Sequence, residues 1–261
     1  MTHAPEIIRF EDVTKAHGGR NVLHRVSLGI RQGEFLAVIG PSGAGKTTLL
    51  RLINRLADAS QGVVRVEGQD VRAVDPIALR RRIGYVFQGI GLFPHMTVAE
   101  NIGITPSLLG WDSRRIAARV EQLIALVRLD PAAHRDRLPH QLSGGERQRV
   151  GVARAIAAEP HIVLMDEPFG ALDPITRDAL GRDYRQLHDA LGVTTVMITH
   201  DALEAVLLAD RIVVVRDGRV IADGTPRALM LEERSDYVGD LLQMPRQQAE
   251  RLQALMDGRP R

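Results

Sequence analysis

The chain has 261 residues, enough to bury a substantial core as one large domain or two closely joined ones. Charged residues make up 25% and hydrophobic residues 44%, as in ordinary soluble globular proteins, and the net charge of +2 gives no reason to expect nucleic-acid binding. The chain has no cysteine, which excludes disulfides and thiolate chemistry. The N-terminus does not resemble a signal peptide and there is no run of about 18 apolar residues, so membrane association is expected only through a partner.

The N-terminal part of the chain predicts strands that lead into a phosphate-binding loop. Polar and apolar residues alternate over 6–31, which indicates a hairpin and neighbouring strands. The apolar run at 35–39 is typical of a buried parallel strand. The next eight residues, GPSGAGKT at 40–47, fit the pattern G-x-x-x-x-G-K-[ST], and a helix is predicted over 46–56.

This loop has the chemistry of a phosphate-binding site. Its glycines let the backbone approach a ligand, so that N–H groups from Gly43 to Thr48 point into one concavity at the positive end of a helix. Lys46 is expected to reach the β- and γ-phosphates, and the Thr47 hydroxyl to bind Mg²⁺. The alternative, a purely structural Gly-rich turn, is disfavoured by a match over eight positions. The residues expected at the nucleotide are Gly40, Ser42, Gly43, Ala44, Gly45, Lys46, Thr47 and Thr48.

The middle of the chain changes from strands to helices. Its periodicity is helical from Gly91 to Ala158, and no strand is expected there. The elements predicted around this region are a short basic helix over 76–82, a buried strand over 83–88, an amphipathic segment over 111–129 and a further helix from about Gly145.

Strands alternate with helices again from His161 onward, and this alternation implies an α/β fold with a mostly parallel sheet covered by helices. The helices predicted here lie over 174–191 and 201–208. We expect a main domain over 1–230, with an antiparallel β subdomain at its N-terminus and a helical insertion at about 90–160. A short C-terminal tail, 231–261, is predicted as one amphipathic helix or as frayed helical pieces.

Two carboxylates follow the apolar strand that ends at Met165. Because ligands bind at the carboxyl edge of open α/β sheets, Asp166 and Glu167 are placed to act on a bound nucleotide. Asp166 is expected to hold the Mg²⁺ shell, and Glu167 to orient or deprotonate the water that attacks the γ-phosphate. A surface turn is the alternative, and it is favoured less behind a complete phosphate loop.

A second glycine-rich helix start lies at residues 142–146, LSGGE. Ser143 is a good N-cap, Glu146 follows closely, and Gly144 and Gly145 let the backbone approach a ligand. By physical chemistry alone, a well-capped helix is the favoured interpretation.

The LSGGE segment resembles the signature motif of ATP-binding-cassette (ABC) ATPases, a family with a P-loop NTPase core. Five further motifs occur in that family's order: the phosphate loop, Gln88 at the end of YVFQ, Asp166-Glu167, the turn at 171–173 (ALD), and His200 at the end of VMITH. The resemblance covers roughly residues 6–230. It implies a head-to-tail dimer in which each ATP, with Mg²⁺, lies between one subunit's phosphate loop and the other subunit's Ser143, Gly144, Gly145 and Glu146.

The resemblance also implies roles for single residues. Gln88 is expected to touch Mg²⁺ and the attacking water, His200 to contact the γ-phosphate and hold Glu167, and Asp173 to couple the two sites across the dimer. A satisfied histidine at a strand end is the alternative for His200.

Two positions depart from the family pattern. His17 occupies the place of the aromatic residue that stacks on adenine, and its smaller ring predicts weaker binding of adenine. Glu146 stands where Gln is commoner, and its charge is expected to be offset by Arg147 or Arg149.

The segment after Gln88, GIGLFPHMTVAENI at 89–102, is where ABC transporter ATPases meet their membrane partners. If Leu92 and Phe93 face solvent, they form a protein-binding patch; the alternative is that they pack into the core of the insertion. The amino-acid sequence of this segment and of the signature region resembles that of ATPase subunits of bacterial importers for glycine betaine, choline and carnitine. This implies permease subunits, indirectly a substrate-binding protein, and a peripheral position on the cytoplasmic face of the inner membrane.

Two alternatives stay open. One is an importer ATPase for another small solute, such as an amino acid, sulfonate or nitrate. The other is a soluble cassette ATPase without a permease. Many of the osmoprotectant subunits continue into a pair of regulatory domains, and none is expected within these 261 residues.

Overall fold

Two sheets organise residues 5–89, 91–170, 172–232 and 236–257, the parts of the chain that the computed structural model describes. The first sheet is antiparallel, with the strand order β2 (Arg20–Arg31), β1 (Glu6–His17), β4 (Gln61–Val66) and β5 (Gln69–Asp70). The second has the order β10 (Arg219–Gly224), β9 (Arg211–Arg216), β3 (Phe35–Ile39), β8 (Thr194–Ile198), β7 (Ile162–Asp166) and β6 (Ile83–Val86). Its neighbouring strands are parallel except β9 and β10.

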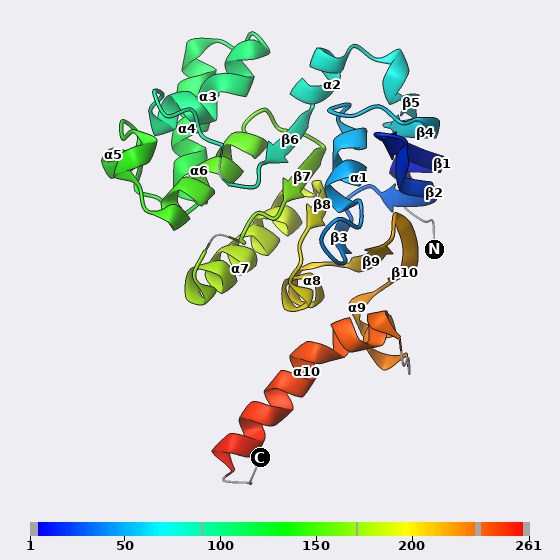
Figure 1. Cartoon of the computed structure of the whole chain (residues 1–261). Coiled ribbons are helices and arrows are strands. Elements are labelled where there is room, and N and C mark those ends of the chain that lie inside the picture. Colours follow the sequence, from blue (N-terminus) through cyan, green and yellow to red (C-terminus); the bar gives the residue numbers. More distant parts are fainter. Residues whose placement is uncertain (1–4, 90, 171, 233–235, 258–261) are drawn as a thin grey trace.

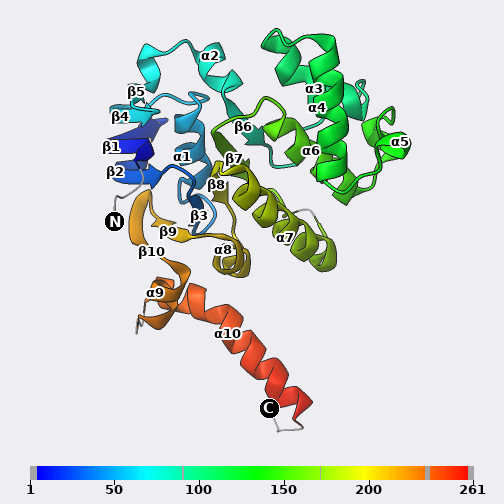
Figure 2. The same cartoon turned by 180° about the vertical axis from the view of Figure 1, so that it is seen from behind.

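Helices cover both faces of the six-stranded sheet (Figures 1 and 2). The helix α1 (Lys46–Ile53) packs between this sheet and the antiparallel one, and α7 (Pro174–Leu191) and α8 (Ala202–Leu208) pack on the opposite face. The inserted helices, which form a separate group in Figure 1, are α3 (Val98–Leu108), α4 (Ser113–Leu126), α5 (Pro131–His134) and α6 (Gly144–Ile156). The short helix α2 (Pro76–Arg81) precedes β6.

The central strand β3 shows why one sheet serves two cores. Successive strand side chains point to opposite faces, so Leu36 and Val38 pack with α1, while Phe35, Ala37 and Ile39 pack on the side of α7 and α8. All five residues are buried, as in a parallel strand covered on both faces.

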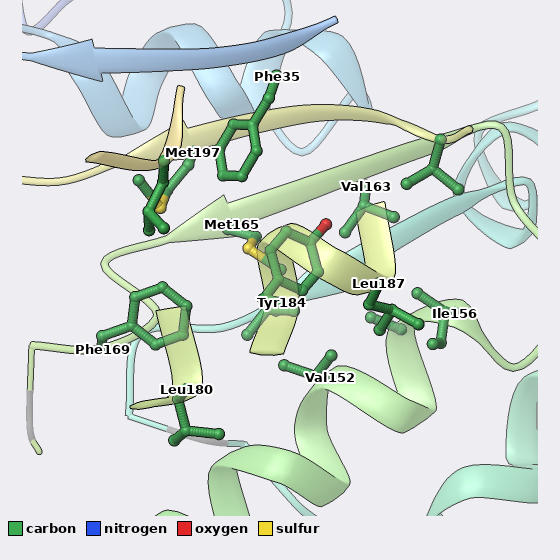
Figure 3. Close-up of a cluster of buried hydrophobic side chains, with 14 of the residues drawn as sticks. Phe35, Val152, Ile156, Val163, Met165, Phe169, Leu180, Tyr184, Leu187 and Met197 are labelled. Atoms are coloured by element: carbon green, nitrogen blue, oxygen red, sulfur yellow. The ribbon is translucent and has the colours of Figure 1, made fainter. Parts of the chain in front are cut away.

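The core on the α7 side joins the sheet to the insertion. Figure 3 shows Tyr184 and Leu187 of α7 between the strand residues and Ile156 of α6. The Tyr184 ring meets Phe35 edge to face at 5.8 Å, and its hydroxyl lies 2.8 Å from Thr195 Oγ1 of β8. Burial raises the pKa of the Tyr184 hydroxyl above its usual range.

The predicted α/β class, with its antiparallel N-terminal sheet and helical insertion, is confirmed, and several boundaries differ. The helix predicted to reach residue 56 ends at Ile53, where the chain turns and Arg55 takes a left-handed φ of 55°. The strand predicted to reach Gln88 ends at Val86. The helix over 174–191 has the predicted bounds, because Asp173 caps its start and Gly192 ends it in a left-handed conformation.

The segment after β10 forms α9 (Pro226–Leu231) and then one continuous helix, α10 (Tyr237–Met256), rather than frayed pieces. The first turns of α10 pack on the body of the protein through the buried side chains of Val238 and Leu242. Its later turns extend away from the rest of the molecule (Figure 1). Within the described ranges, no helix combines the length and apolar character needed to cross a membrane.

Candidate active site

The loop between β3 and α1 needs glycine where no side chain fits. Gly40 has a φ of 147°, and a Cβ there would collide with the carbonyl of Val215. Gly45 has a φ of 99°, and its Cβ would lie 2.7 Å from Leu23 Cδ2. Because α1 begins at Lys46, directly after this turn, its first amide groups are available to an anion held by the loop.

Lys46 lies across its own loop. Its Nζ donates hydrogen bonds to the carbonyl oxygens of Gly40 at 2.8 Å and Pro41 at 3.0 Å, which use two of the three donors of an ammonium group. Burial lowers the pKa of Lys46, and the charges of Glu167 and Asp166 oppose that shift. The loop therefore holds a fixed cation at the edge of the sheet.

Thr47 and Asp166 bring two oxygen ligands together. The Thr47 hydroxyl donates to Asp166 Oδ1 at 3.2 Å, which joins the start of α1 to the end of β7. Asp166 is only 4% exposed, and this burial raises the pKa of its carboxyl. Among the described residues there is no cluster of three or more His, Cys, Asp or Glu side chains suited to a metal. A hydroxyl and a buried carboxylate are a fitting donor set for Mg²⁺ that also keeps phosphate and water ligands.

Three predicted catalytic residues meet at one oxygen atom. Glu167 Oε2 accepts a hydrogen bond from Gln88 Nε2 at 3.0 Å and lies 3.5 Å from His200 Nδ1. The three residues come from the segments that follow β6, β7 and β8, so the carboxyl ends of neighbouring parallel strands assemble them. Glu167 has a left-handed φ of 46°, a strained conformation of the kind found at functional sites.

Arg177 joins two loops beside this group, and no sequence motif predicted that role. Its guanidinium donates to Asp201 Oδ2 at 3.3 Å and to the carbonyl of Leu172 at 3.2 Å. It therefore links the segments on either side of the site, which carry Asp173 and His200. No spacing rule reveals such a residue, because its partners lie on two different loops.

The start of α6 is a complete capping box. Ser143 Oγ accepts the Glu146 N–H at 3.2 Å, and Glu146 Oε2 accepts the Ser143 N–H at 2.7 Å. Hydrogen bonds from Ser143 and from His134 hold the pKa of Glu146 down at about 2, so Glu146 is a carboxylate at neutral pH. The starts of α1 and α6 lie in separate parts of the molecule (Figures 1 and 2), so the two glycine-rich helix starts do not meet within one chain.

The prediction that Arg147 or Arg149 offsets the charge of Glu146 is wrong. Arg147 donates to the carbonyl of Leu142 at 2.7 Å, and Arg149 pairs with Asp183 at 2.9 Å. The neighbour of Glu146 is instead His134 of α5, whose Nε2 lies 2.9 Å from Glu146 Oε1. The capping box draws the Glu146 side chain back toward Ser143, away from the next turn of its own helix.

The remaining predicted residues stand apart from this group. Asp173 caps α7 and accepts the N–H groups of Ile175 and Thr176 at 3.1 Å each. Hydrogen bonding from the Thr176 side chain, together with these N–H groups, lowers the pKa of Asp173. His17 is exposed at the end of β1. Ala171, part of the predicted turn at 171–173, lies outside the described residues.

An aromatic groove lies beside the insertion. It has a volume of about 480 Å³, and its lining includes Leu56, Arg80, Phe87, Phe93, Leu108 and Arg154. Phe87 is 44% exposed and Phe93 40% exposed, and the Arg154 guanidinium lies within 6 Å of both ring centres. Leu92 packs against the core, as the second interpretation of this segment expects, while Phe93 faces solvent and lines the groove.

Comparison with known sequences identifies the class of protein. Residues 23–170 match the ABC transporter family. The glycine betaine/carnitine/choline transport ATP-binding protein OpuCA of Bacillus subtilis is 44% identical over 260 residues, which cover 97% of this chain and 68% of the relative. The glycine betaine uptake system ATP-binding protein YehX of Escherichia coli is 45% identical, with coverages of 89% and 75%. A sulfate/thiosulfate import ATP-binding protein of Caulobacter vibrioides is 47% identical, with coverages of 84% and 65%.

Solved structures agree with this class. A dimeric ATP-binding cassette in a post-hydrolysis state, bound to ADP and Pi, superposes with a TM-score of 0.75 at 32% identity, covering 84% of this chain and 98% of that one. The chain therefore belongs to the ABC transporter family and is an ATPase of the ATP-binding-cassette type.

Proposed function

We propose that this chain is the ATP-hydrolysing subunit of a binding-protein-dependent importer for osmoprotectants of the quaternary-amine class, such as glycine betaine. The observation that carries the hydrolytic role is the meeting of Gln88, Glu167 and His200 at one carboxylate oxygen beside a phosphate loop. The substrate class is supported by relatives of Bacillus subtilis and Escherichia coli that are named for glycine betaine transport.

In this proposal the phosphates of ATP lie against the loop amides and Lys46, while water attacks the γ-phosphorus in line with the bond to ADP. Glu167 accepts the proton of that water, because a carboxylate at the end of β7 can act as a general base. His200 holds Glu167 and contacts the γ-phosphate. His17 lies beside the adenine.

Thr47, Asp166 and Gln88 would hold Mg²⁺. Bound there, Mg²⁺ would supply positive charge to offset the charge that develops on the transferred phosphoryl group. Asp166 suits this task because burial has already raised the free energy of its ionised form, so a nearby cation stabilises it.

A second copy of the chain completes each site. In the proposed cycle, ATP closes this dimer and so powers the permease, and hydrolysis reopens it. Ser143 and the amides at the start of α6 face the partner's γ-phosphate, where the helix dipole favours an anion. Asp173, exposed at the start of α7, lies at the dimer interface. The dimeric cassette bound to ADP and Pi supports this arrangement.

The aromatic groove is the proposed docking surface for the permease. Exposed phenylalanine rings beside the Arg154 guanidinium favour a short apolar segment of another protein. Through this contact the chain lies on the cytoplasmic face of the inner membrane, and the permease in turn meets a substrate-binding protein.

Phe93→Asp is expected to abolish co-purification of a permease from native membranes, because a charge in the groove opposes burial of an apolar segment. ATP hydrolysis by the purified chain should stay within about twofold of the parent, since surface substitutions rarely disturb distant sites. Leu126→Asp is the matched control, because Leu126 is similarly exposed, at 42%, and does not line the groove. Retention of the permease by Phe93→Asp would place the docking surface elsewhere.

Uptake of labelled glycine betaine at high osmolarity tests the function as a whole. Cells that lack this chain are complemented with the parent or with Glu167→Gln, and uptake is expected only with the parent. If uptake never depends on the chain, the quaternary-amine assignment fails while the ATPase assignment stands.

A second candidate is import of another small solute. The sulfate/thiosulfate relative favours it, because that protein is as similar as those named for glycine betaine over the residues it shares. Two measurements decide between these candidates. One is the identity of the co-purified permease, and the other is whether sulfate competes with the uptake of labelled glycine betaine.

A further inference from the structure

His134 and Glu146 form a pair that the hydrolytic steps above leave unused. His134 ends α5, and its Nε2 lies 2.9 Å from Glu146 Oε1 at the start of α6. The other ring nitrogen, Nδ1, lies 3.0 Å from the carbonyl oxygen of Asp130. Both side chains are largely covered, with 13% of His134 and 30% of Glu146 exposed.

The two partners of His134 fix its protonation state. The Asp130 carbonyl can only accept a hydrogen bond, so Nδ1 must carry a proton. Glu146 is ionised, and a carboxylate likewise only accepts, so Nε2 must carry a proton as well. A ring that donates from both nitrogens is an imidazolium, so the arrangement holds one positive charge against one negative charge.

Most of the other charged groups around this pair have partners of their own. Arg135 pairs with Glu121 of α4 and lies 3.9 Å from Asp136, and Glu100 of α3 caps its own helix through Thr97. Three further charged groups nearby also have other partners: Asp130 caps α5 through Ala132 N–H, Arg147 binds the carbonyls of Leu142 and Pro139, and Arg149 pairs with Asp183. Arg137 follows α5, where its backbone N–H donates to the His134 carbonyl at 3.1 Å. Among the described residues, His134 is therefore the cation hydrogen-bonded to Glu146.

We propose that His134 is a positioning residue for the partner's ATP: as an imidazolium it neutralises Glu146 and holds it in the capping box that shapes the start of α6. This inference rests on the proposed function, in which that helix start faces the partner's γ-phosphate. Loss of a proton from His134 removes its hydrogen bond to Glu146. The Glu146 carboxylate is then left uncompensated close to the partner's triphosphate. Repulsion between these anions then weakens ATP-driven closure of the dimer, so closure is expected to weaken at alkaline pH, where histidine side chains are uncharged.

The test uses chains that carry Glu167→Gln, so that bound ATP is not consumed, and measures the ATP concentration for half-maximal dimerisation by sedimentation. His134→Gln is compared with the parent from about pH 5 to about pH 8, where histidine changes charge. ATP phosphates also titrate near pH 6, so the quantity compared is the ratio of the two concentrations at each pH. We expect His134→Gln to need about tenfold more ATP at the acidic end, the effect of losing one charged hydrogen bond, and the ratio to approach one as the pH rises. The exposed His140, in the segment between α5 and α6, gives the matched control His140→Gln, whose ratio should stay near one throughout.

A second pair of variants separates charge from packing. When Glu146→Gln is present, His134 has no charge to offset, so adding His134→Gln should change the ATP requirement less than about twofold at every pH. The inference is overturned if the ratio is independent of pH, or if His134→Gln has the same effect in chains with Glu146 and in chains with Glu146→Gln. Either result leaves the proposed ATP-bound dimer untouched. If the Glu167→Gln chain does not dimerise with ATP at any pH, the proposed function fails and this inference fails with it.

Discussion

Glu167→Gln is expected to lower ATP turnover about a thousandfold, the scale of losing a general base, while ATP binding persists. A glutamine side chain can still accept the hydrogen bond that Gln88 donates to Glu167 at 3.0 Å, so the geometry of the site is retained. It cannot take the proton of the attacking water. Because hydrolysis reopens the dimer in the proposed cycle, the variant should accumulate as an ATP-bound dimer, seen by sedimentation with and without ATP.

Glu159→Gln is the matched control for this substitution. Glu159 is an exposed carboxylate beside Arg115 on the insertion, and its neutralisation should leave turnover within about twofold of the parent. Turnover at the parent rate by Glu167→Gln would show that another group is the base. A variant that neither hydrolyses nor dimerises would assign Glu167 a role in binding.

The sequence predicted which residues gather beside the phosphate loop because they lie at the ends of strong local patterns. Apolar runs mark the strands β3, β7 and β8, and parallel pairing brings their carboxyl ends to one edge. Glu167 and His200, separated by 33 positions, therefore come within 3.5 Å of each other. The strained φ of Glu167 could not be predicted, because nothing in a DEP sequence requires a left-handed glutamate.

The partner of Glu146 was missed for a physical reason. Opposite charges one turn apart on the same helix commonly pair, so Arg149 was an expected partner for Glu146. A capping box reverses the direction of the side chain, and the surface it then meets belongs to α5, twelve positions earlier. The place of α5 depends on how the insertion packs, and no local signal encodes it. Arg177 was missed because its partners lie on two different loops.

Isolated mixed dimers should show that each ATP site draws on two chains. One chain carries Lys46→Ala, which removes the phosphate-loop cation, and the other carries Ser143→Arg, which blocks the start of α6. Each homodimer has both sites damaged and is expected to be inactive. In the mixed dimer one site receives both lesions and the other receives none, so about half of the parent's turnover should remain if the sites act independently. Two affinity tags isolate this species.

The decisive control places both substitutions on one chain and pairs it with the parent chain. Shared sites then predict almost no activity, because each site receives one lesion. If each chain instead formed a complete site, the outcome would be reversed, with the doubly substituted pairing active and the first mixture inactive. The separation of the starts of α1 and α6 within one chain is what favours the shared arrangement. The two pairings contain the same substitutions in the same number, so a difference in folding of single variants cannot reproduce the expected contrast.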